Sequence, residues 1–235
     1  MNRTFAIVLL FAGIALTASA KGNHTFVQGK MPDAYDYLPP PPKEVGSDEA
    51  WLLDSALYVS SKALRETSRG ERAVEDASFE IDHYMKRISE VYGKTLTKEK
   101  YPALANVLEG AYNDTRSTIS KAKKNFARPR PYMHFNDSTP VLPYKGKNAY
   151  TSYPSGHSTR AWTVAMVMTM IDPAHAAGYA KMGYDMGVSR MIVGFHYYSD
   201  VEAARLAASM GFARLCAEKS FLKAVKKARK ELQKK

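Results

Sequence analysis

The sequence predicts an all-α fold, in which a single domain is built as a bundle of helices. Between Tyr101 and Ala111, apolar residues recur every three or four positions, which is the spacing of an amphipathic helix. Residues 161–171, AWTVAMVMTMI, are apolar on every side, which is typical of a helix buried in a core and too short to span a bilayer. Strict alternation of apolar and polar residues, the pattern of a β-strand, is hard to find.

Prolines and a capping pattern set the expected boundaries of the helices. Pro129 and Pro131 stop the amphipathic helix, because proline lacks a backbone N–H and clashes with the preceding turn. Ser199 and Glu202 match a Ser-x-x-Glu capping box, which we expect to begin the last helix of the core. The expected helices span residues 51–64, 97–126, 161–171, 173–188 and 201–217, and residues 132–154 are expected to form a loop.

Composition excludes several classes of protein. The chain has 235 residues, a length that suits one domain with a sizeable core. Hydrophobic residues make up 45% of it, which excludes a disordered chain, and the single Cys216 excludes a disulfide scaffold or a cysteine-built metal site. The net charge of +11 indicates an anionic partner without identifying it.

The first 20 residues have the three parts of a secretory signal peptide. Arg3 precedes an apolar run over residues 5–18, and Ala18-Ser19-Ala20 is a small-x-small cleavage site. An uncleaved N-terminal anchor is the alternative interpretation. Cleavage after Ala20 would place the protein in a periplasm or outside the cell. No later segment is apolar for long enough to span a bilayer, so we expect no integral membrane segment in the mature chain.

The expected organisation is therefore a signal peptide over residues 1–20, an extended arm over 21–46 and one helical domain over 47–235. The arm contains the run Pro39 to Pro42, which favours an extended conformation that wraps around the domain. At the other end, residues 219–235 carry eight basic residues, with Phe221, Leu222, Val225 and Leu232 expected along one face. We expect an amphipathic helix docked on the domain, with a membrane-surface role as the alternative.

Three short segments carry the side chains that suggest chemistry. In residues 121–132, KAKKNFARPRPY, a lysine and an arginine seven positions apart lie two helical turns apart on one face and can converge on one anion. In residues 153–158, YPSGHS, Ser155 and Gly156 are expected to open a helix whose N–H groups and dipole point at a bound anion. Residues 189–200, SRMIVGFHYYSD, add Arg190, His196 and Asp200.

Each segment alone has an ordinary structural explanation. A basic pair on a helix is usually solvated, a lone histidine is usually a satisfied loop residue, and an arginine or aspartate near a helix end is commonly a cap. Together they supply cations for phosphate oxygens, a nucleophile, an acid for the leaving group and a carboxylate that orients the nucleophile. That combination is what phosphoryl transfer requires.

The order K-x6-RP, PSGH, SR-x5-H-x3-D resembles the signature of the phosphatidic-acid-phosphatase type 2 (PAP2) and vanadium haloperoxidase superfamily. Within it, the chain is most similar to the secreted class A bacterial non-specific acid phosphatases. The similarity spans about residues 36–215 and includes LPPPP at 38–42, RETSRGERAVEDA at 65–77 and VEAAR at 201–205. It implies an all-α helical bundle of the PAP2/haloperoxidase type. Thr151 and Ser158 are mild departures from the usual Gly-Ser-Tyr-Pro-Ser-Gly-His-Thr.

The first motif fits the sequence twice. One frame pairs Lys121 with Arg128, and the other pairs Lys123 with Arg130. The class A pattern resembles Arg-x-Arg-Pro-aromatic with the second arginine used, so the resemblance favours Lys123 and Arg130.

The chemistry and the resemblance agree on the roles in the site. His196 is expected to attack phosphorus and form a phosphohistidine, Asp200 to hold its other ring nitrogen, and His157 to protonate the leaving group. The groups expected to bind the phosphate oxygens are Lys123, Arg130, Ser155, Gly156 and Arg190. Three fixed cations neutralise the phosphate, so we expect no metal and no cofactor. His134 is considered as a pocket-rim residue.

The predicted function is hydrolysis of a broad range of phosphate monoesters, with a phosphotransferase side activity. Expected substrates are nucleotides and sugar or aryl phosphates, with no nucleic acid as partner and homo-oligomer formation left open. Phe79 and Tyr153 are considered for stacking on a nucleoside or aryl group, against the simpler interpretation that they pack in the fold. The alternative function is a vanadate-binding haloperoxidase-like enzyme, with His196 as the vanadate ligand. A lipid phosphatase would be expected to carry several transmembrane helices, and a phosphate- or nucleic-acid-binding protein would not explain the His196–Asp200 pair.

Overall fold

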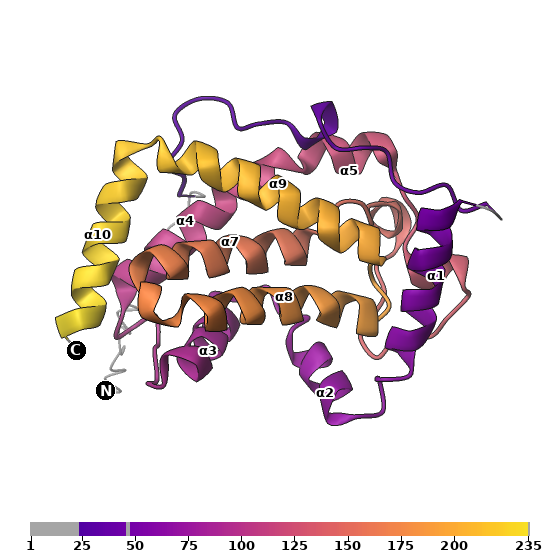
Figure 1. Cartoon of the computed structure of the whole chain (residues 1–235), viewed down its shortest axis with the longest axis horizontal. Coiled ribbons are helices and arrows are strands. Elements are labelled where there is room, and N and C mark those ends of the chain that lie inside the picture. Colours follow the sequence, from indigo (N-terminus) through magenta and orange to yellow (C-terminus); the bar gives the residue numbers. More distant parts are fainter. Residues whose placement is uncertain (1–23, 46–47, 235) are drawn as a thin grey trace, which may run out of the picture.

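The computed structural model describes residues 24–45 and 48–234, so the predicted signal peptide lies outside the described residues. Helices form all the regular structure in these residues, with no strand among them, which confirms the all-α prediction (Figure 1). The elements are η1 (Ala34–Asp36), α1 (Glu49–Lys62), α2 (Ser68–Glu75), α3 (Ile81–Tyr92), α4 (Pro102–Thr118), α5 (Ser120–Phe126), α6 (Pro131–His134), η2 (Gly146–Tyr150), α7 (Gly156–Ile171), η3 (Pro173–His175), α8 (Ala176–Ile192), α9 (Tyr198–Cys216) and α10 (Lys219–Lys234).

Helix α7 forms the centre of the bundle. It packs against α4, α8 and α9, and Figure 1 shows α8 and α9 running alongside it. Most of its apolar residues are buried, as predicted for residues 161–171, and Val164, Val167 and Met168 are almost completely inaccessible to solvent. One face differs from the prediction, because Trp162, Met166 and Met170 are only partly buried. The helix begins at Gly156, earlier than predicted, so the segment with Ser155, Gly156 and His157 stands at its N-terminus.

The predicted helix over residues 97–126 is wrong at both its start and its middle. Pro102 occupies the first turn of α4, a position that suits proline because the first N–H groups of a helix have no intrahelical partner. At the other end, the hydroxyls of Ser117 and Thr118 donate to carbonyls three residues back. The helix is interrupted at Ile119 before α5 begins. Side chains that bond to the backbone in this way compete with the helical hydrogen bonds.

Two further boundaries differ from the prediction. Residues 132–154 are not entirely a loop, because α6 and η2 interrupt them. The capping box predicted at Ser199 and Glu202 is wrong: α9 begins at Tyr198, and the Asp200 carboxylate accepts the N–H of Tyr197 at 2.9 Å. The N–H of Ser199 instead donates to Asp54 of α1 at 2.8 Å.

The proline-rich arm follows the surface of the bundle. Its path runs beside α9 and α5 in Figure 1, with the short η1 turn as its only helical element among residues 24–45. The N–H of Phe26 donates to Asp114 of α4 at 2.7 Å, and the Tyr153 hydroxyl donates to the Pro39 carbonyl at 2.8 Å. Leu38 is buried against the domain. These contacts fix the arm near its start and around Leu38 and Pro39.

Helix α10 closes one end of the bundle. It buries Phe221, Val225, Ala228 and Leu232, whereas Leu222 is 43% exposed and does not lie on the buried face as predicted. The helix also caps α4, because the Glu231 carboxylate accepts the N–H groups of Ala103 and Leu104.

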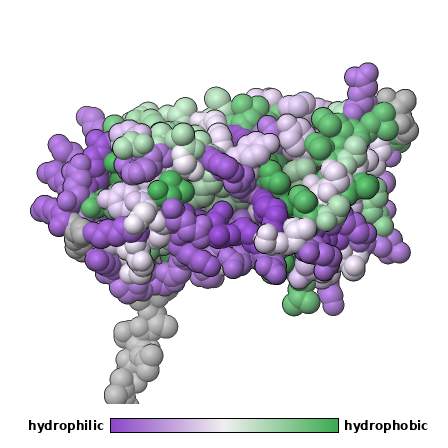
Figure 2. All heavy atoms as spheres, turned by 60° about the horizontal axis from the view of Figure 1, so that its bottom comes forward, coloured by the Kyte–Doolittle hydropathy of each residue, from purple (hydrophilic) through white to green (hydrophobic). Residues whose placement is uncertain are grey.

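Hydrophilic and hydrophobic side chains are distributed unevenly over the surface. Figure 2 shows the side that carries α2 and α3 as mostly hydrophilic, with hydrophobic side chains gathered toward the end where α1 lies. On α1 the exposed residues include Leu52, Leu53 and Val59. Within the described chain, no helix is both long and apolar enough to cross a membrane.

Replacing Phe221 by Ala should lower the free energy of unfolding by about 3–5 kcal/mol, because a fully buried ring that contacts Phe26 and Phe212 is lost. Leu222→Ala, one position away on the exposed face, is the matched control and should change stability by less than about 1 kcal/mol. Urea unfolding of both variants measures the difference. Equal effects would mean that α10 does not dock through the Phe221 face.

Candidate active site

A cavity of about 490 Å³ brings together residues from four distant parts of the chain. It lies where α4, α5 and the start of α7 meet the segment between α8 and α9. No aspartate or glutamate of the described chain is among its lining residues, although four cationic side chains are. The lining residues are Phe79, Tyr112, Arg116, Ile119, Ser120, Lys123, Arg130, Tyr144, Asn148, Thr151, Gly156, His157, Arg160 and His196.

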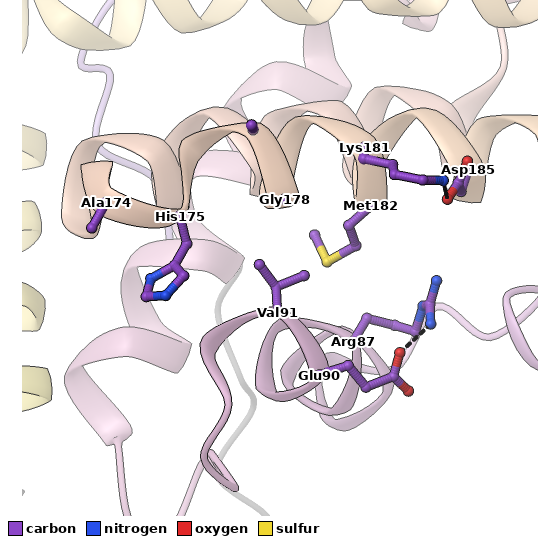
Figure 3. A pocket seen from close by; sticks show the side chains of 10 residues that line it. Arg87, Glu90, Val91, Ala174, His175, Gly178, Lys181, Met182 and Asp185 are labelled. Carbon is purple, nitrogen blue, oxygen red and sulfur yellow. Dashed lines mark hydrogen bonds and ion pairs between the residues drawn. The ribbon is translucent and has the colours of Figure 1, made fainter.

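A second hollow, between α3 and α8, has a different character (Figure 3). Its charged residues pair with one another: Arg87 with Glu90, and Lys181 with Asp185 at 2.5 Å. Such self-compensated pairs leave little charge for a ligand. None of the site residues predicted from sequence lines this hollow, so it is not the candidate site.

A tight turn between α8 and α9 presents His196 to the cavity. Gly194 has φ +83°, a conformation that glycine adopts at little cost, and a Cβ there would lie 2.6 Å from Arg65. His196 is 2% exposed. Its Nδ1 lies 3.4 Å from the Asp200 carboxylate, and its Nε2 lies 3.0 Å from Nη1 of Arg130. One ring nitrogen is therefore held by a carboxylate while the other faces the cations of the cavity.

Asp200 is completely buried and fully engaged. Its carboxylate accepts hydrogen bonds from the Ser152 hydroxyl at 2.5 Å, the Tyr197 N–H at 2.9 Å and Arg128 at 2.8 Å. Burial alone would raise the pKa of Asp200, but the Arg128 charge and the hydrogen bonds from His196 and Ser152 hold that pKa well below its ordinary value. These interactions favour the ionised carboxylate, which faces Nδ1 of His196 at 3.4 Å.

The two possible frames of the first motif occupy different places. Lys123 and Arg130 line the cavity. Arg128 is buried behind it, between Asp54 at 2.9 Å and Asp200 at 2.8 Å. Lys121 is exposed and pairs with Asp33 and Asp36 on the proline-rich arm.

Lys123 and Arg130 are anchored by backbone carbonyls rather than by acids. Lys123 Nζ donates to the Thr151 carbonyl at 2.7 Å, and burial together with the charge of Arg130 lowers the pKa of Lys123 to about 7. Arg130 donates to the carbonyls of Asn148 and Phe195 at 3.1 and 2.9 Å, and burial lowers its pKa. A negative ligand would restore the charged form of Lys123, so the pair is suited to an anion.

The predicted helix N-terminus is present at Ser155 and Gly156. Ser155 is the N-cap of α7, and its hydroxyl accepts the N–H of Ser158 at 3.3 Å and the Ser158 hydroxyl at 2.9 Å. Ser155 is buried and does not itself line the cavity. Gly156 does, and a Cβ on it would make an ordinary van der Waals contact with Lys123 Cε at 3.8 Å.

His157 lies on the opposite wall, one residue into α7. Its Nε2 is 3.0 Å from the Ala77 carbonyl, and its ring centroid is 3.6 Å from that of Phe79. A carbonyl only accepts, so Nε2 carries the hydrogen in this arrangement and Nδ1 is the nitrogen left to gain or lose a proton. Burial and the charge of Arg190 lower the pKa of His157 well below its ordinary value.

Arg190 is a buried cation with few partners among the described residues. It is 1% exposed, and its Nε and Nη1 make no hydrogen bond within the described chain. Its guanidinium lies 5.1 Å from the Phe195 ring, and burial lowers its pKa to about 10. A buried guanidinium without acceptors is costly unless a ligand supplies them, so Arg190 fits the anion site that the other residues form.

Comparison with known proteins agrees with this geometry. The model of the PAP2 superfamily matches residues 103–221, which include every predicted site residue. The chain belongs to the PAP2 superfamily. It is 36% identical over 204 residues to a non-specific acid phosphatase of Providencia stuartii, with 86% of this chain and 82% of the relative covered. It is also 35% identical to a non-specific acid phosphatase of Salmonella typhi, covering 83% and 78% of the two chains, and 33% identical to an acid phosphatase of Zymomonas mobilis, covering 96% and 86%.

Several residues of this candidate site were not predicted from sequence. The Ser152 hydroxyl donates a hydrogen bond to the Asp200 carboxylate. Arg116 and Arg160 add two cations to the cavity wall. Arg160 stands three residues after His157 on α7, a spacing that places both on one helical face, so the sequence contained a signal for it. Ser152 matches the second residue of the Gly-Ser-Tyr-Pro-Ser-Gly-His-Thr pattern, which was a signal for it, whereas no comparable pattern marks Arg116.

Two residues considered from sequence lie elsewhere. His134 is not a rim residue: its Nδ1 pairs with Glu44 at 2.7 Å, and its ring packs against Trp51. Tyr153 is buried and bonded to Pro39, so it packs in the fold, whereas Phe79 does line the cavity of the PAP2 site. In the part of the chain that the structure describes, no cluster of three or more histidine, cysteine or acidic residues could hold a metal ion.

Replacing Arg128 by Met should lower the free energy of unfolding by about 3–5 kcal/mol, because it leaves the buried carboxylates Asp54 and Asp200 without their shared cation. Lys121→Met removes an exposed cation that also pairs with two aspartates, and its effect on stability should be much smaller because water screens the exposed pairs. Chemical denaturation of both variants gives the comparison. A small effect of Arg128→Met would show that the PAP2 site does not depend on this buried ion-pair group.

Proposed function

We propose that the protein hydrolyses a broad range of phosphate monoesters through a phosphohistidine on His196, and that it works in a periplasm or outside the cell. The observation that carries the proposal is the state of His196, held at Nδ1 by a buried carboxylate and directed at Nε2 into a cavity lined by cations without acids. Family membership supports phosphatase chemistry, and the signal-peptide pattern of residues 1–20 supports export.

In the first step, the Nε2 lone pair of His196 attacks phosphorus. Asp200 keeps the proton on Nδ1 and offsets the positive charge that the ring gains when the N–P bond forms, as a carboxylate does in a catalytic triad. Without ligand, Arg130 Nη1 donates to the same Nε2 at 3.0 Å. An incoming phosphate oxygen offers Arg130 a stronger, charged acceptor, so substrate binding itself releases the nucleophile.

Three cations are suited to hold the non-bridging oxygens. Arg130 and Lys123 line the cavity together with His196. Arg190 is not among the lining residues, but it has two buried nitrogens without a hydrogen-bond partner in the described chain. The Gly156 N–H, in the first turn of α7, adds a backbone donor at the positive end of the helix dipole. Ser155 contributes mainly by capping this helix, since its hydroxyl already accepts two hydrogen bonds from Ser158.

His157 is suited to protonate the leaving group. Its low pKa in the free protein arises from burial and from the positive charge of Arg190. A bound phosphate dianion would offset the charge of Arg190 and so raise the pKa of His157. The substrate therefore raises the affinity of His157 for a proton. The protonated Nδ1 then gives that proton to the departing alkoxide, and neutral His157 next takes a proton from the water that attacks phosphohistidine.

The second half-reaction restores the protein. Water adds its oxygen to phosphorus, the N–P bond breaks, the electron pair returns to Nε2 of His196, and inorganic phosphate leaves. An alcohol in place of water would give phosphotransfer by the same route. The haloperoxidase-like alternative would instead need vanadate bound at His196, so phosphatase assays are run without vanadate.

Rapid mixing of His157→Ala with 4-nitrophenyl phosphate should give a burst of one 4-nitrophenolate per site, because the base for the second step is missing and phosphohistidine accumulates. A phosphate label stable to alkali and labile to acid should map to His196. His157→Ala combined with His196→Ala is the control and should show neither burst nor label. A label on another side chain, or turnover that requires vanadate, would contradict the proposal.

Loss of His157 should affect substrates unequally. His157→Ala should lower kcat/KM by about 10²–10⁴ for alkyl phosphates, whose leaving groups need a proton, and far less for aryl phosphates. The low pKa of His157 means that its proton is lost as pH rises, so wild-type kcat/KM on alkyl phosphates should peak below about pH 6.5 and fall toward neutrality. Rates from pH 4 to 8 test this. Equal losses on both substrate types would remove His157 from its role.

A further inference from the structure

The cavity holds more positive charge than one phosphate monoester needs. Lys123, Arg130 and Arg190 suffice for the non-bridging oxygens in the proposed function, yet Arg116 and Arg160 also line the same wall. Neither Arg116 nor Arg160 has an ion-pair partner among the described residues, and no acid lines the cavity there. The two arginines are therefore uncompensated charges facing a solvent-filled space.

Arg160 is held in place by its surroundings. It is 7% exposed, its Nη1 donates to the Phe79 carbonyl, and its guanidinium lies between the rings of Tyr84 and Tyr112 at 4.6 and 4.4 Å. Its buried Nε has no hydrogen-bond partner in the described chain. A rigid, almost buried guanidinium with a free donor is a built anion site rather than a solvated surface arginine.

The position of this pair relative to the reaction is defined by His157. In an in-line displacement, nucleophile and leaving group lie on opposite sides of phosphorus, so the leaving group lies toward His157 and away from His196. Arg160 follows His157 by three residues on α7, and Phe79 contacts both of them. Arg116 follows Tyr112 by four residues on α4 and stands at the exposed rim of the same wall.

We propose that Arg160 and Arg116 form a second anion subsite on the leaving-group side, so that the preferred substrates carry a carboxylate or a second phosphoryl group on the organic part that departs. The inference rests on the proposed function and deepens it. Phe79 and Tyr112 also line the cavity, with ring centroids 6.5 Å apart, and their aromatic surface suits a flat carrier such as an aryl ring.

A pair of matched substrates tests the subsite. 4-Carboxyphenyl phosphate and 4-carbamoylphenyl phosphate have the same shape and differ in the remote charge. Since the carbamoyl group withdraws more electron density, leaving-group chemistry alone favours the amide. Wild-type protein should nevertheless show kcat/KM about 10- to 100-fold higher on the carboxylate, the size expected for hydrogen bonds to a charged group. The ratio should shrink as salt is added.

Variants assign the preference to the two arginines. Arg160→Met and Arg116→Gln should each lower the carboxylate-to-amide ratio, and the double variant should bring it close to one. Arg160→Lys, which keeps the charge, should retain part of it. Lys124→Gln removes an exposed cation of α5 that does not line the cavity and should leave the ratio as in wild type. Because Arg116 is exposed, its variant reports on the subsite even if Arg160→Met folds poorly.

The outcomes separate this inference from the proposed function. No hydrolysis of either substrate would count against the function, whereas hydrolysis of both with a ratio near one would overturn the subsite alone. Equal losses on both substrates in Arg160→Met and Arg116→Gln would also overturn it, as they indicate a structural role. 4-Phosphonophenyl phosphate distinguishes the two anions, with kcat/KM on the amide as the common reference. If the phosphonate is preferred over the amide more strongly than the carboxylate is, the subsite favours a second phosphoryl group. If it is preferred less strongly, the subsite favours a carboxylate.

Discussion

The ionised carboxylate of Asp200 is the interaction on which the site depends. Its side chain accepts hydrogen bonds from Ser152, Tyr197 and Arg128 and faces Nδ1 of His196, while its main-chain carbonyl accepts the N–H of Ser155 at 2.9 Å. One residue thereby connects the start of α9, the segment before α7, and the first motif. A buried charge is tolerated only when it is paired and fully hydrogen-bonded, and here the same bonds that satisfy the charge also fix the geometry.

Arg128 illustrates how a structural charge supports a functional one. It bridges Asp54 of α1 and Asp200 of α9 and lies 4.0 Å from the Tyr197 ring. The guanidinium is completely removed from the cavity, so it contributes through Asp200 rather than by touching a ligand. A fork of planar donors can serve two carboxylates at once, which a lysine ammonium does less well.

The cavity combines two opposed demands. Cations packed together without acids repel one another, and burial lowers the pKa of Lys123, Arg130 and Arg190. This arrangement costs stability in the empty protein, and under the proposed function a bound anion would offset that cost. The backbone carbonyls of Thr151, Phe195 and Asn148 hold the side chains in position without cancelling their charge. Such preorganised charge is what stabilises phosphoryl transfer.

Local patterns in the sequence were enough to predict the all-α class, the buried central helix and the superfamily motifs. These features depend on periodicity and on residues close together in the chain. The break at Ile119 was missed because hydroxyls of the helix itself compete for its carbonyls, which apolar periodicity does not reveal. The cap of α9 was missed because Ser199 bonds instead to Asp54, which lies far from it in sequence.

The choice between the two frames of the first motif was also beyond local spacing, since Lys121–Arg128 and Lys123–Arg130 have the same separation. Only the tertiary structure turns one pair toward the cavity and the other toward Asp33, Asp36, Asp54 and Asp200. The same holds for Arg116 and Arg160, which line the same cavity only because α4 packs against α7. The sequence by itself thus determined which chemical groups the protein possesses, whereas long-range packing decided which of them remain uncompensated, because a charge is neutralised by its neighbours in space.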